Sequence, residues 1–132
     1  MERNLIILRG VPGSGKSTVA FLFGGMICCT DDYFTDADGN YNWNLEEVGI
    51  AHKSCQDKCE DAMKNNEEKI IIANTNTTDK EMKPYEELAK EYNYKVFHLV
   101  IENRHGNSSI HNVPEETINK MTDRLRNTIK LK

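Results

Sequence analysis

The sequence feature that most constrains the fold is a glycine-rich stretch near the N-terminus, GVPGSGKST at residues 10–18. It follows an apolar run at residues 5–8, which is short enough for a buried strand, and it precedes residues 19–23, which can continue as a helix. Glycines let backbone N–H groups turn toward an anion, and the N-terminus of a helix adds a partial positive charge. A strand, a glycine-rich loop and a helix in this order predict a P-loop that binds nucleotide phosphates.

Two side chains of this loop have an expected part in binding ATP. Lys16 is expected to reach the β- and γ-phosphates, and the Ser17 hydroxyl is expected to bind Mg²⁺. The alternative is a glycine-rich turn that matches the pattern by chance, and the flanking strand and helix argue against it. The predicted nucleotide-binding residues are Gly10, Pro12, Gly13, Ser14, Gly15, Lys16, Ser17 and Thr18.

Length and composition limit the remaining possibilities. The 132 residues suit one domain spanning 1–132. The 17 Lys and Arg against 21 Asp and Glu argue against a broad, nonspecific nucleic-acid surface but leave room for a local basic pocket. No apolar run is long enough to cross a bilayer and the N-terminus lacks signal-peptide regions, so we expect a cytoplasmic protein without a membrane contact. The four cysteines lack the paired spacing of zinc sites, so we expect reduced core residues.

Four apolar stretches, at residues 5–8, 26–30, 69–73 and 95–101, are typical of strands and alternate with stretches of helical periodicity. This order predicts an α/β fold, the three-layer P-loop NTPase or kinase fold with a small parallel sheet of about four strands. The β-branched run at 69–73 suits a central strand buried on both faces. Thr78 and Glu81 have the spacing of a capping box, Pro84 predicts a kink or a later helix start, and Pro114 is expected to begin the last helix.

Polar residues follow two of these strands, at the sheet edge where ligands bind in open α/β folds. Asp31, after the second strand, can accept a proton from an attacking hydroxyl or hold a water on Mg²⁺. Alternatively, Asp31 or Asp32 caps the next helix. The residues after the third strand either satisfy turn backbone groups or orient the substrate. The candidate substrate-binding residues are Asp32, Asn74, Thr75 and Asn76.

Three further side chains have two open interpretations each. Tyr41 and Trp43 lie in the polar loop at residues 35–44, where they can stack on a base or anchor the loop. His52 shares a helix face with apolar residues, and a histidine in that position is more often packed than catalytic.

The stretches GVPGSGKST, TDDYF, DGNYNWN, the pair Ala51-His52, IIIANTNTTDKEMKPYEELAKEYNYKVFH and HNVPEETINKM together cover nearly the whole chain. They resemble the polynucleotide 5′-kinase family of P-loop proteins. The resemblance implies an ATP- and Mg²⁺-dependent kinase that phosphorylates 5′-hydroxyl ends of DNA or RNA. It implies that Asp31 is the general base and that Lys16 neutralises charge on the transferred group. It also implies that Ser17 is a metal ligand and that Arg104 is a lid arginine that holds the triphosphate.

The chain departs from the bacteriophage members of that family at three positions. Phe34 and Asn74 stand where those members have an arginine and an aspartate. Ser108 stands near the position where those members have a second lid arginine. The first two departures imply a changed acceptor pocket. A short chain has little surface to grip a long duplex, so the expected partners are ATP and single-stranded or short nucleic acid. The alternatives are a small-metabolite or nucleoside kinase, or an ATP-binding regulatory module without transfer activity.

Overall fold

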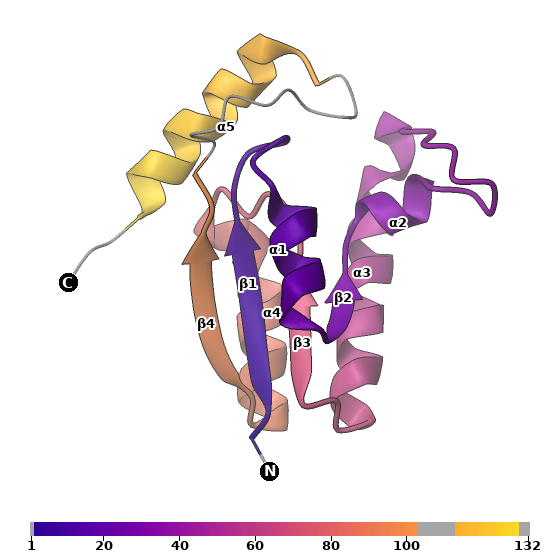
Figure 1. The fold of residues 1–132 in the computed structure, drawn as a ribbon, viewed down its shortest axis with the longest axis vertical. Helices are drawn as coiled ribbons and strands as arrows, with labels where there is room; N and C mark the ends of the chain where they lie inside the picture. The colour runs from indigo at the N-terminus through magenta and orange to yellow at the C-terminus, as the bar shows by residue number, and fades with distance from the viewer. Residues whose placement is uncertain (1, 103–112, 130–132) are drawn as a thin grey trace.

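The computed structural model describes residues 2–102 and 113–129 (Figure 1). In this part of the chain, four parallel strands form one sheet in the order β2-β3-β1-β4. The strands are β1 (Asn4–Arg9), β2 (Met26–Cys28), β3 (Lys69–Ile72) and β4 (Lys95–Val100). The predicted α/β fold with a small parallel sheet is confirmed, although β2 ends two residues earlier than its apolar pattern indicated.

Helices cover both faces of the sheet and make three layers (Figure 1). Helix α1 (Lys16–Phe23) packs on one face, and α3 (Val48–Lys64) and α4 (Asp79–Tyr92) pack on the other. Helix α2 (Asp31–Phe34) follows β2, a 3-10 turn (Leu45–Glu47) precedes α3, and α5 (Glu115–Thr128) lies beyond the carboxyl ends of β1 and β4. The arrangement collects the loops after β1, β2 and β3 at one edge of the sheet.

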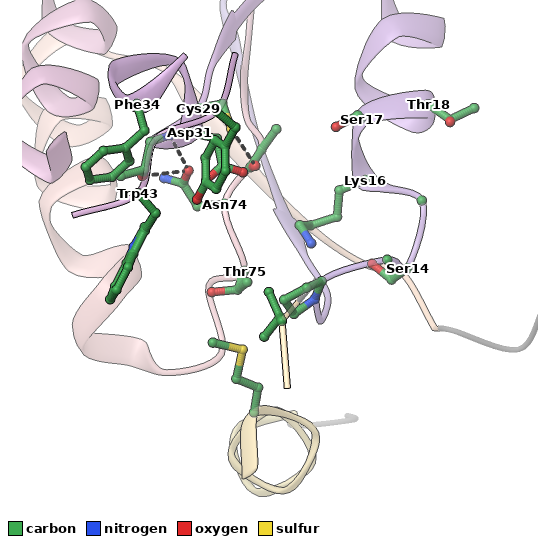
Figure 2. Close-up of a pocket in the computed structure, with 18 of the residues that line it drawn as sticks. Ser14, Lys16, Ser17, Thr18, Cys29, Asp31, Phe34, Trp43, Asn74 and Thr75 are labelled. Carbon is green, nitrogen blue, oxygen red and sulfur yellow. Dashed lines mark hydrogen bonds between the residues drawn. The ribbon is translucent and has the colours of Figure 1, made fainter. Parts of the chain in front are cut away.

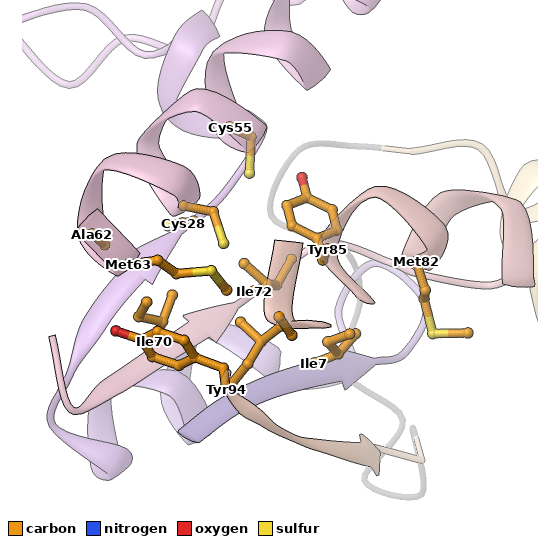
Figure 3. Close-up of a cluster of buried hydrophobic side chains, with 13 residues drawn as sticks. Ile7, Cys28, Cys55, Ala62, Met63, Ile70, Ile72, Met82, Tyr85 and Tyr94 are labelled. Atoms are coloured by element: carbon orange, nitrogen blue, oxygen red, sulfur yellow. The ribbon is translucent and has the colours of Figure 1, made fainter. Parts of the chain in front are cut away.

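The two central strands account for most of the core. Alternate residues of β1 and β3 face opposite layers, as the twofold period of a strand requires. Ile7 and Ile72 pack toward α3 and α4 (Figure 3), whereas Leu8 and Ile71 pack toward α1, and all four are fully buried. The prediction that the third strand is buried on both faces is therefore confirmed.

Three of the four cysteines also belong to the core. Cys28, Cys55 and Cys59 are buried beside β3 and the inner face of α3, and Cys29 is half-buried. All four are free thiols. The prediction of core residues is confirmed for Cys28, Cys55 and Cys59, whereas Cys29 packs against the core from a half-buried position.

Local signals fixed the start of α4. The Thr78 side chain accepts from the Glu81 backbone N–H, and the Glu81 carboxylate accepts from the Thr78 backbone N–H, which makes the predicted capping box. The helix begins at Asp79 and contains Pro84, so the alternative prediction of a later helix start at Pro84 is wrong.

Asn76 holds the loop between β3 and α4 against the end of β1. Its backbone has a φ of 48°, and the residue is 1% exposed. Its Nδ2 donates to the Leu8 carbonyl oxygen at 2.8 Å, and its own carbonyl oxygen accepts from Arg9 Nε at 2.9 Å. Arg9 Nη2 also donates to Thr128 Oγ1 at 2.5 Å, so the same contact network reaches α5. The loop after β3 is thus fixed by buried hydrogen bonds.

We expect Asn76→Ala to lower the free energy of unfolding by about 2–4 kcal/mol. The substitution leaves a buried carbonyl without its donor and places alanine in a left-handed conformation. Urea denaturation measures the change. Asn66→Ala is the matched control because Asn66 has a φ of 57° but is exposed, and we expect it to lose about 1 kcal/mol. Equal losses would show that the backbone conformation, and not the buried contact, sets the cost.

Candidate nucleotide and acceptor site

The loop between β1 and α1 has the shape that a phosphate cradle needs. Gly13 and Gly15 have φ values of 83° and 103°, which a residue with a side chain rarely adopts. A Cβ on Gly10 would lie 2.6 Å from Ser14 Oγ and 2.8 Å from the Ile101 carbonyl oxygen. The loop therefore folds tightly on itself and leads directly into the N-terminus of α1, an arrangement that suits an anion.

A pocket of about 700 Å³ opens beside this loop (Figure 2). It brings together the loop, the start of α2, the end of the loop at residues 35–44 and the residues after β3. The predicted site residues that line it are Pro12, Gly13, Ser14, Gly15, Lys16, Ser17, Thr18, Asp31, Asn74 and Thr75. The volume is typical of sites for small molecules and cofactors.

The Lys16 side chain folds back onto the phosphate loop. Its Nζ donates to the Val11 carbonyl oxygen at 2.9 Å. Burial lowers the pKa of Lys16 to about 8, and the nearby Cys29 and Asp31 oppose that change. An anion in the pocket would restore the stability of the charged ammonium, so the site favours a ligand with negative charge.

This partly buried cation gives a testable dependence of stability on pH. Because the folded protein lowers the pKa of Lys16 from 10.5 to about 8, the unfolded chain binds more protons between these values. We therefore expect Lys16→Met to raise the free energy of unfolding of the ligand-free protein by about 1–3 kcal/mol below pH 8. The difference should shrink as the pH rises from about 8 and be lost above about 10.5. Urea denaturation across this range measures it, and a difference independent of pH would contradict the burial of the charge.

Asp31 faces the same pocket from the first turn of α2. Tyr41 OH donates to its Oδ1 at 3.1 Å. Burial, followed by the charge of Asp31, raises the pKa of Tyr41 to about 12, so the phenol remains a donor at neutral pH. The residue at the N-cap of α2 is Thr30, so neither Asp31 nor Asp32 occupies the capping position. The carboxylate of Asp31 is thus oriented by the loop at residues 35–44.

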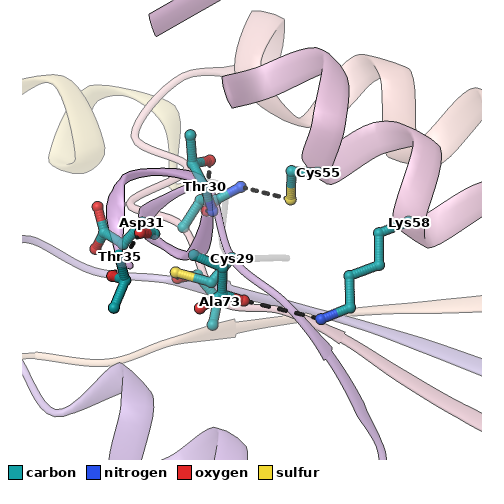
Figure 4. Close-up of polar contacts among 9 residues, drawn as sticks. Cys29, Thr30, Asp31, Thr35, Cys55, Lys58 and Ala73 are labelled. Atoms are coloured by element: carbon teal, nitrogen blue, oxygen red, sulfur yellow. Dashed lines mark hydrogen bonds and ion pairs between the residues drawn. The ribbon is translucent and has the colours of Figure 1, made fainter. Parts of the chain in front are cut away.

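Asn74 fixes the turn that carries Asp31. Its Oδ1 accepts from the Thr30 backbone N–H at 2.7 Å and from Thr30 Oγ1 at 2.8 Å. Its Nδ2 donates to Cys55 Sγ at 3.6 Å and to Tyr85 OH at 3.4 Å. Figure 4 shows two of these partners, Thr30 before α2 and Cys55 on α3. These contacts give Asn74 a positioning part, whereas Thr75 turns its hydroxyl toward the pocket in Figure 2.

Other predicted site residues lie away from the pocket lining. The carboxylate of Asp32 pairs with Lys58, with Oδ2 and Nζ 3.8 Å apart, and the Asp32 side chain is largely exposed. Figure 4 shows Lys58 on α3. Asn76 donates to the Leu8 carbonyl oxygen of β1, and Gly10 lies directly against the Ser14 side chain. Arg104 and Ser108 lie outside the described residues.

Several pocket residues had no signal in the sequence. Cys29, Val48, Val113 and Met121 line the pocket from four different segments. Val48 and Met121 belong to apolar helix faces, which periodicity assigns to a core without distinguishing a core from a pocket wall. His52 lines the pocket as well, so it lies at the site whichever of its two interpretations holds.

The donor set is compatible with Mg²⁺ bound mainly through a nucleotide. Residues 2–102 and 113–129 contain no group of three or more His, Cys, Asp or Glu that could hold a metal ion. Mg²⁺ needs no such group, because it commonly takes one or two protein oxygens together with phosphates and water. Ser17, exposed in the first turn of α1 and lining the pocket, could supply one such oxygen. In the same part of the chain, no helix has the length and apolar character of a membrane span.

Comparisons with known proteins agree with this arrangement. Residues 5–128 match the profile of a family, AAA_33, described as an AAA domain. NEDD4-binding protein 2 from Homo sapiens is 41% identical to the chain over 70% of the chain's length. The chain spans only 5% of the length of that relative.

Two solved structures share the fold. A chain of the Pnkp1/Rnl/Hen1 complex superposes with a TM-score of 0.61 and 24% identity, covering 90% of this chain and 38% of that one. The Cys556Ala mutant of the APS kinase CysC from Mycobacterium tuberculosis superposes with a TM-score of 0.54 and 11% identity. The match covers 95% of this chain and 98% of that chain. At these identities the likeness shows the fold alone, which is a kinase-like P-loop fold.

Proposed function

Because this chain belongs to the AAA_33 family of AAA domains and has a kinase-like P-loop fold, we propose that it is an ATP-dependent kinase of 5′-hydroxyl ends in single-stranded or short DNA or RNA. The observation that carries this proposal is the position of Asp31. Its carboxylate, oriented by Tyr41, lines the same pocket as Lys16 and the phosphate loop. A base and a phosphate cradle in one pocket are the parts that phosphoryl transfer to an alcohol requires.

The chain's own residues divide the reaction between them. The backbone N–H groups of the loop and Lys16 hold the phosphates of ATP and stabilise the charge that develops on the transferred group. Asp31 accepts the proton of the acceptor hydroxyl as that oxygen forms a bond to the γ-phosphorus and the bond to the ADP oxygen breaks. Ser17 would help to hold Mg²⁺, which when bound neutralises charge on the phosphates. Most of the catalysis then comes from positioning and charge.

The proposal also names the acceptor and assigns a role to the lid arginine, Arg104. The family resemblance supports a nucleic-acid acceptor, and it assigns Arg104 to the triphosphate as a cation that strengthens its contacts in the transition state. Removing such a cation should cost about 2–4 kcal/mol of transition-state stabilisation, as for other preorganised donors. Among the substrate-binding candidates, we assign contact with the acceptor to Thr75, because it lines the pocket, and the positioning of Asp31 to Asn74, because it binds the preceding residue, Thr30.

Transfer of label from ATP tests the proposal. The protein is incubated with Mg²⁺, ATP labelled at the γ-phosphate, and either a short 5′-hydroxyl oligonucleotide, the same oligonucleotide with a 5′-phosphate, or free nucleosides. We expect label on the 5′-hydroxyl oligonucleotide and none on its 5′-phosphorylated counterpart. Label only on nucleosides would replace the acceptor with a small molecule. Tight ATP binding without transfer to any acceptor would leave a nucleotide-binding module.

A further inference from the structure

Trp43 is an exposed aromatic side chain on the wall of the pocket. It is the only tryptophan in the chain, it is 55% exposed, and it lines the pocket. Figure 2 shows its indole on the side of Asn74 and Phe34, across the opening from Lys16. An indole left open to water beside a cavity offers a large flat surface for a ring of the ligand.

The loop that carries Trp43 is held in place. Thr35 and Tyr41 pair as an antiparallel bridge, and the Asn42 N–H donates to the Phe34 carbonyl oxygen at 2.8 Å. Asp36 Oδ1 closes the loop by accepting from the backbone N–H groups of Asp38 and Asn40, both at 2.9 Å. On the other side of Trp43, the Asn44 side chain accepts from the Glu46 N–H at 3.0 Å and caps the next turn. The indole is therefore presented by an ordered backbone, which reduces the entropy lost when a ligand binds.

The same loop orients the proposed base. Tyr41, two residues before Trp43, donates to Asp31. An acceptor whose hydroxyl lies at Asp31 would therefore lie beside this loop, and Trp43 is an exposed ring of the loop that lines the same pocket.

The chemistry of this side of the pocket selects what it can recognise. Phe34, Tyr41, Trp43 and Val48 make it apolar and aromatic, and Asp31 gives it a negative charge. Within the described lining, Lys16 is the one Lys or Arg, and it belongs to the phosphate loop. Resting on the function proposed above, we propose that Trp43 stacks on the base of the 5′-terminal nucleotide, so that the acceptor is recognised by that base. An acceptor without a terminal base should bind poorly.

The single tryptophan provides a direct readout of stacking that does not depend on turnover. With ADP and Mg²⁺ present, the intrinsic fluorescence is followed while a short 5′-hydroxyl oligonucleotide is added, and again with the same oligonucleotide made abasic at its 5′-terminal residue. We expect the first to quench Trp43 and the second to bind about 5- to 140-fold more weakly, which is the range for stacking of one base. Equal affinity for both would overturn the proposal. So would a full quench by ADP alone, because the indole would then meet the base of the nucleotide donor.

Steady-state kinetics give an independent test. Trp43→Ala should raise KM for the base-bearing acceptor by a similar 5- to 140-fold and leave KM for ATP and activity on the abasic acceptor nearly unchanged. Trp43→Phe should recover most of the loss. Leu45→Ala is the control, since Leu45 is 71% exposed near the same loop but does not line the pocket.

The two tests separate this inference from the proposed function. If Trp43→Ala phosphorylates the base-bearing acceptor as well as the parent does, the stacking proposal fails and the kinase stands. If no acceptor is phosphorylated but the abasic change still abolishes quenching, Trp43 remains the base platform and the proposed reaction fails.

Discussion

Asp31→Asn is expected to lower kcat for phosphorylation of a 5′-hydroxyl acceptor by about 10²- to 10⁴-fold, the usual contribution of a positioned general base. Asparagine keeps the size of the side chain and an oxygen that can accept from Tyr41 OH, so the pocket should keep its shape. The amide cannot take the proton of the acceptor hydroxyl. Measured ATP affinity should remain within a few fold of that of the parent, because in the proposed reaction Asp31 serves the acceptor and not the phosphates.

Asp32→Asn is the matched comparison for this variant. Both carboxylates lie in the first turn of α2, but Asp32 pairs with Lys58 on the surface and is absent from the pocket lining. We expect its effect on kcat to be at least about tenfold smaller than that of Asp31→Asn. If Asp31→Asn kept activity within a few fold of the parent, another group would have to be the proton acceptor.

Lys16→Met should lower kcat/KM for ATP by about 10²- to 10³-fold, the range for removal of one preorganised hydrogen-bond donor from an enzyme active site. Among the described residues that line the pocket, Lys16 is the one Lys or Arg, and methionine fills similar space without a charge. Calorimetric titration with ATP in the absence of acceptor should show the loss at the binding step.

The pH dependence supports the same assignment. Since burial lowers the pKa of Lys16 to about 8, the free protein loses the cation as pH rises through that value. ATP affinity of the parent should fall above about pH 8, and affinity of Lys16→Met should not follow that fall. Lys69→Met is the control, because Lys69 likewise donates to a backbone carbonyl oxygen, that of Phe23 at 2.8 Å, but does not line the pocket. Equal ATP affinity of parent and Lys16→Met would place the phosphates elsewhere.

The departures at Phe34 and Asn74 have a structural meaning that the sequence could not supply. Phe34 is buried and packs edge-on against Tyr33 and Tyr41, with ring centroids 5.2 and 6.2 Å apart, so it supports the loop that orients Asp31. Asn74 holds the Thr30 turn through its amide oxygen, while its amide nitrogen donates to Cys55 of α3 and Tyr85 of α4. Both positions therefore shape the side of the pocket that carries Asp31.

The sequence by itself determined the features that depend on neighbouring residues. The P-loop, the capping box at Thr78 and the buried run of β3 each depend on a few consecutive side chains and backbone angles, and a short pattern records such dependence. The carboxyl ends of parallel strands share one edge, so the meeting of Asp31 with the phosphate loop also followed from the order of strands along the chain.

Only the tertiary structure decided which of these polar side chains face the pocket. Asp31 and Asp32 are adjacent in sequence, but successive residues on a helix point about 100° apart, so Asp31 turns to the pocket and Asp32 to Lys58. Asn74 and Asn76 follow the same strand, yet Asn76 binds the carbonyl of Leu8, 68 residues away in sequence. Such partners are set by packing between distant segments, and distant packing leaves no periodic trace in the sequence that a local pattern can reveal.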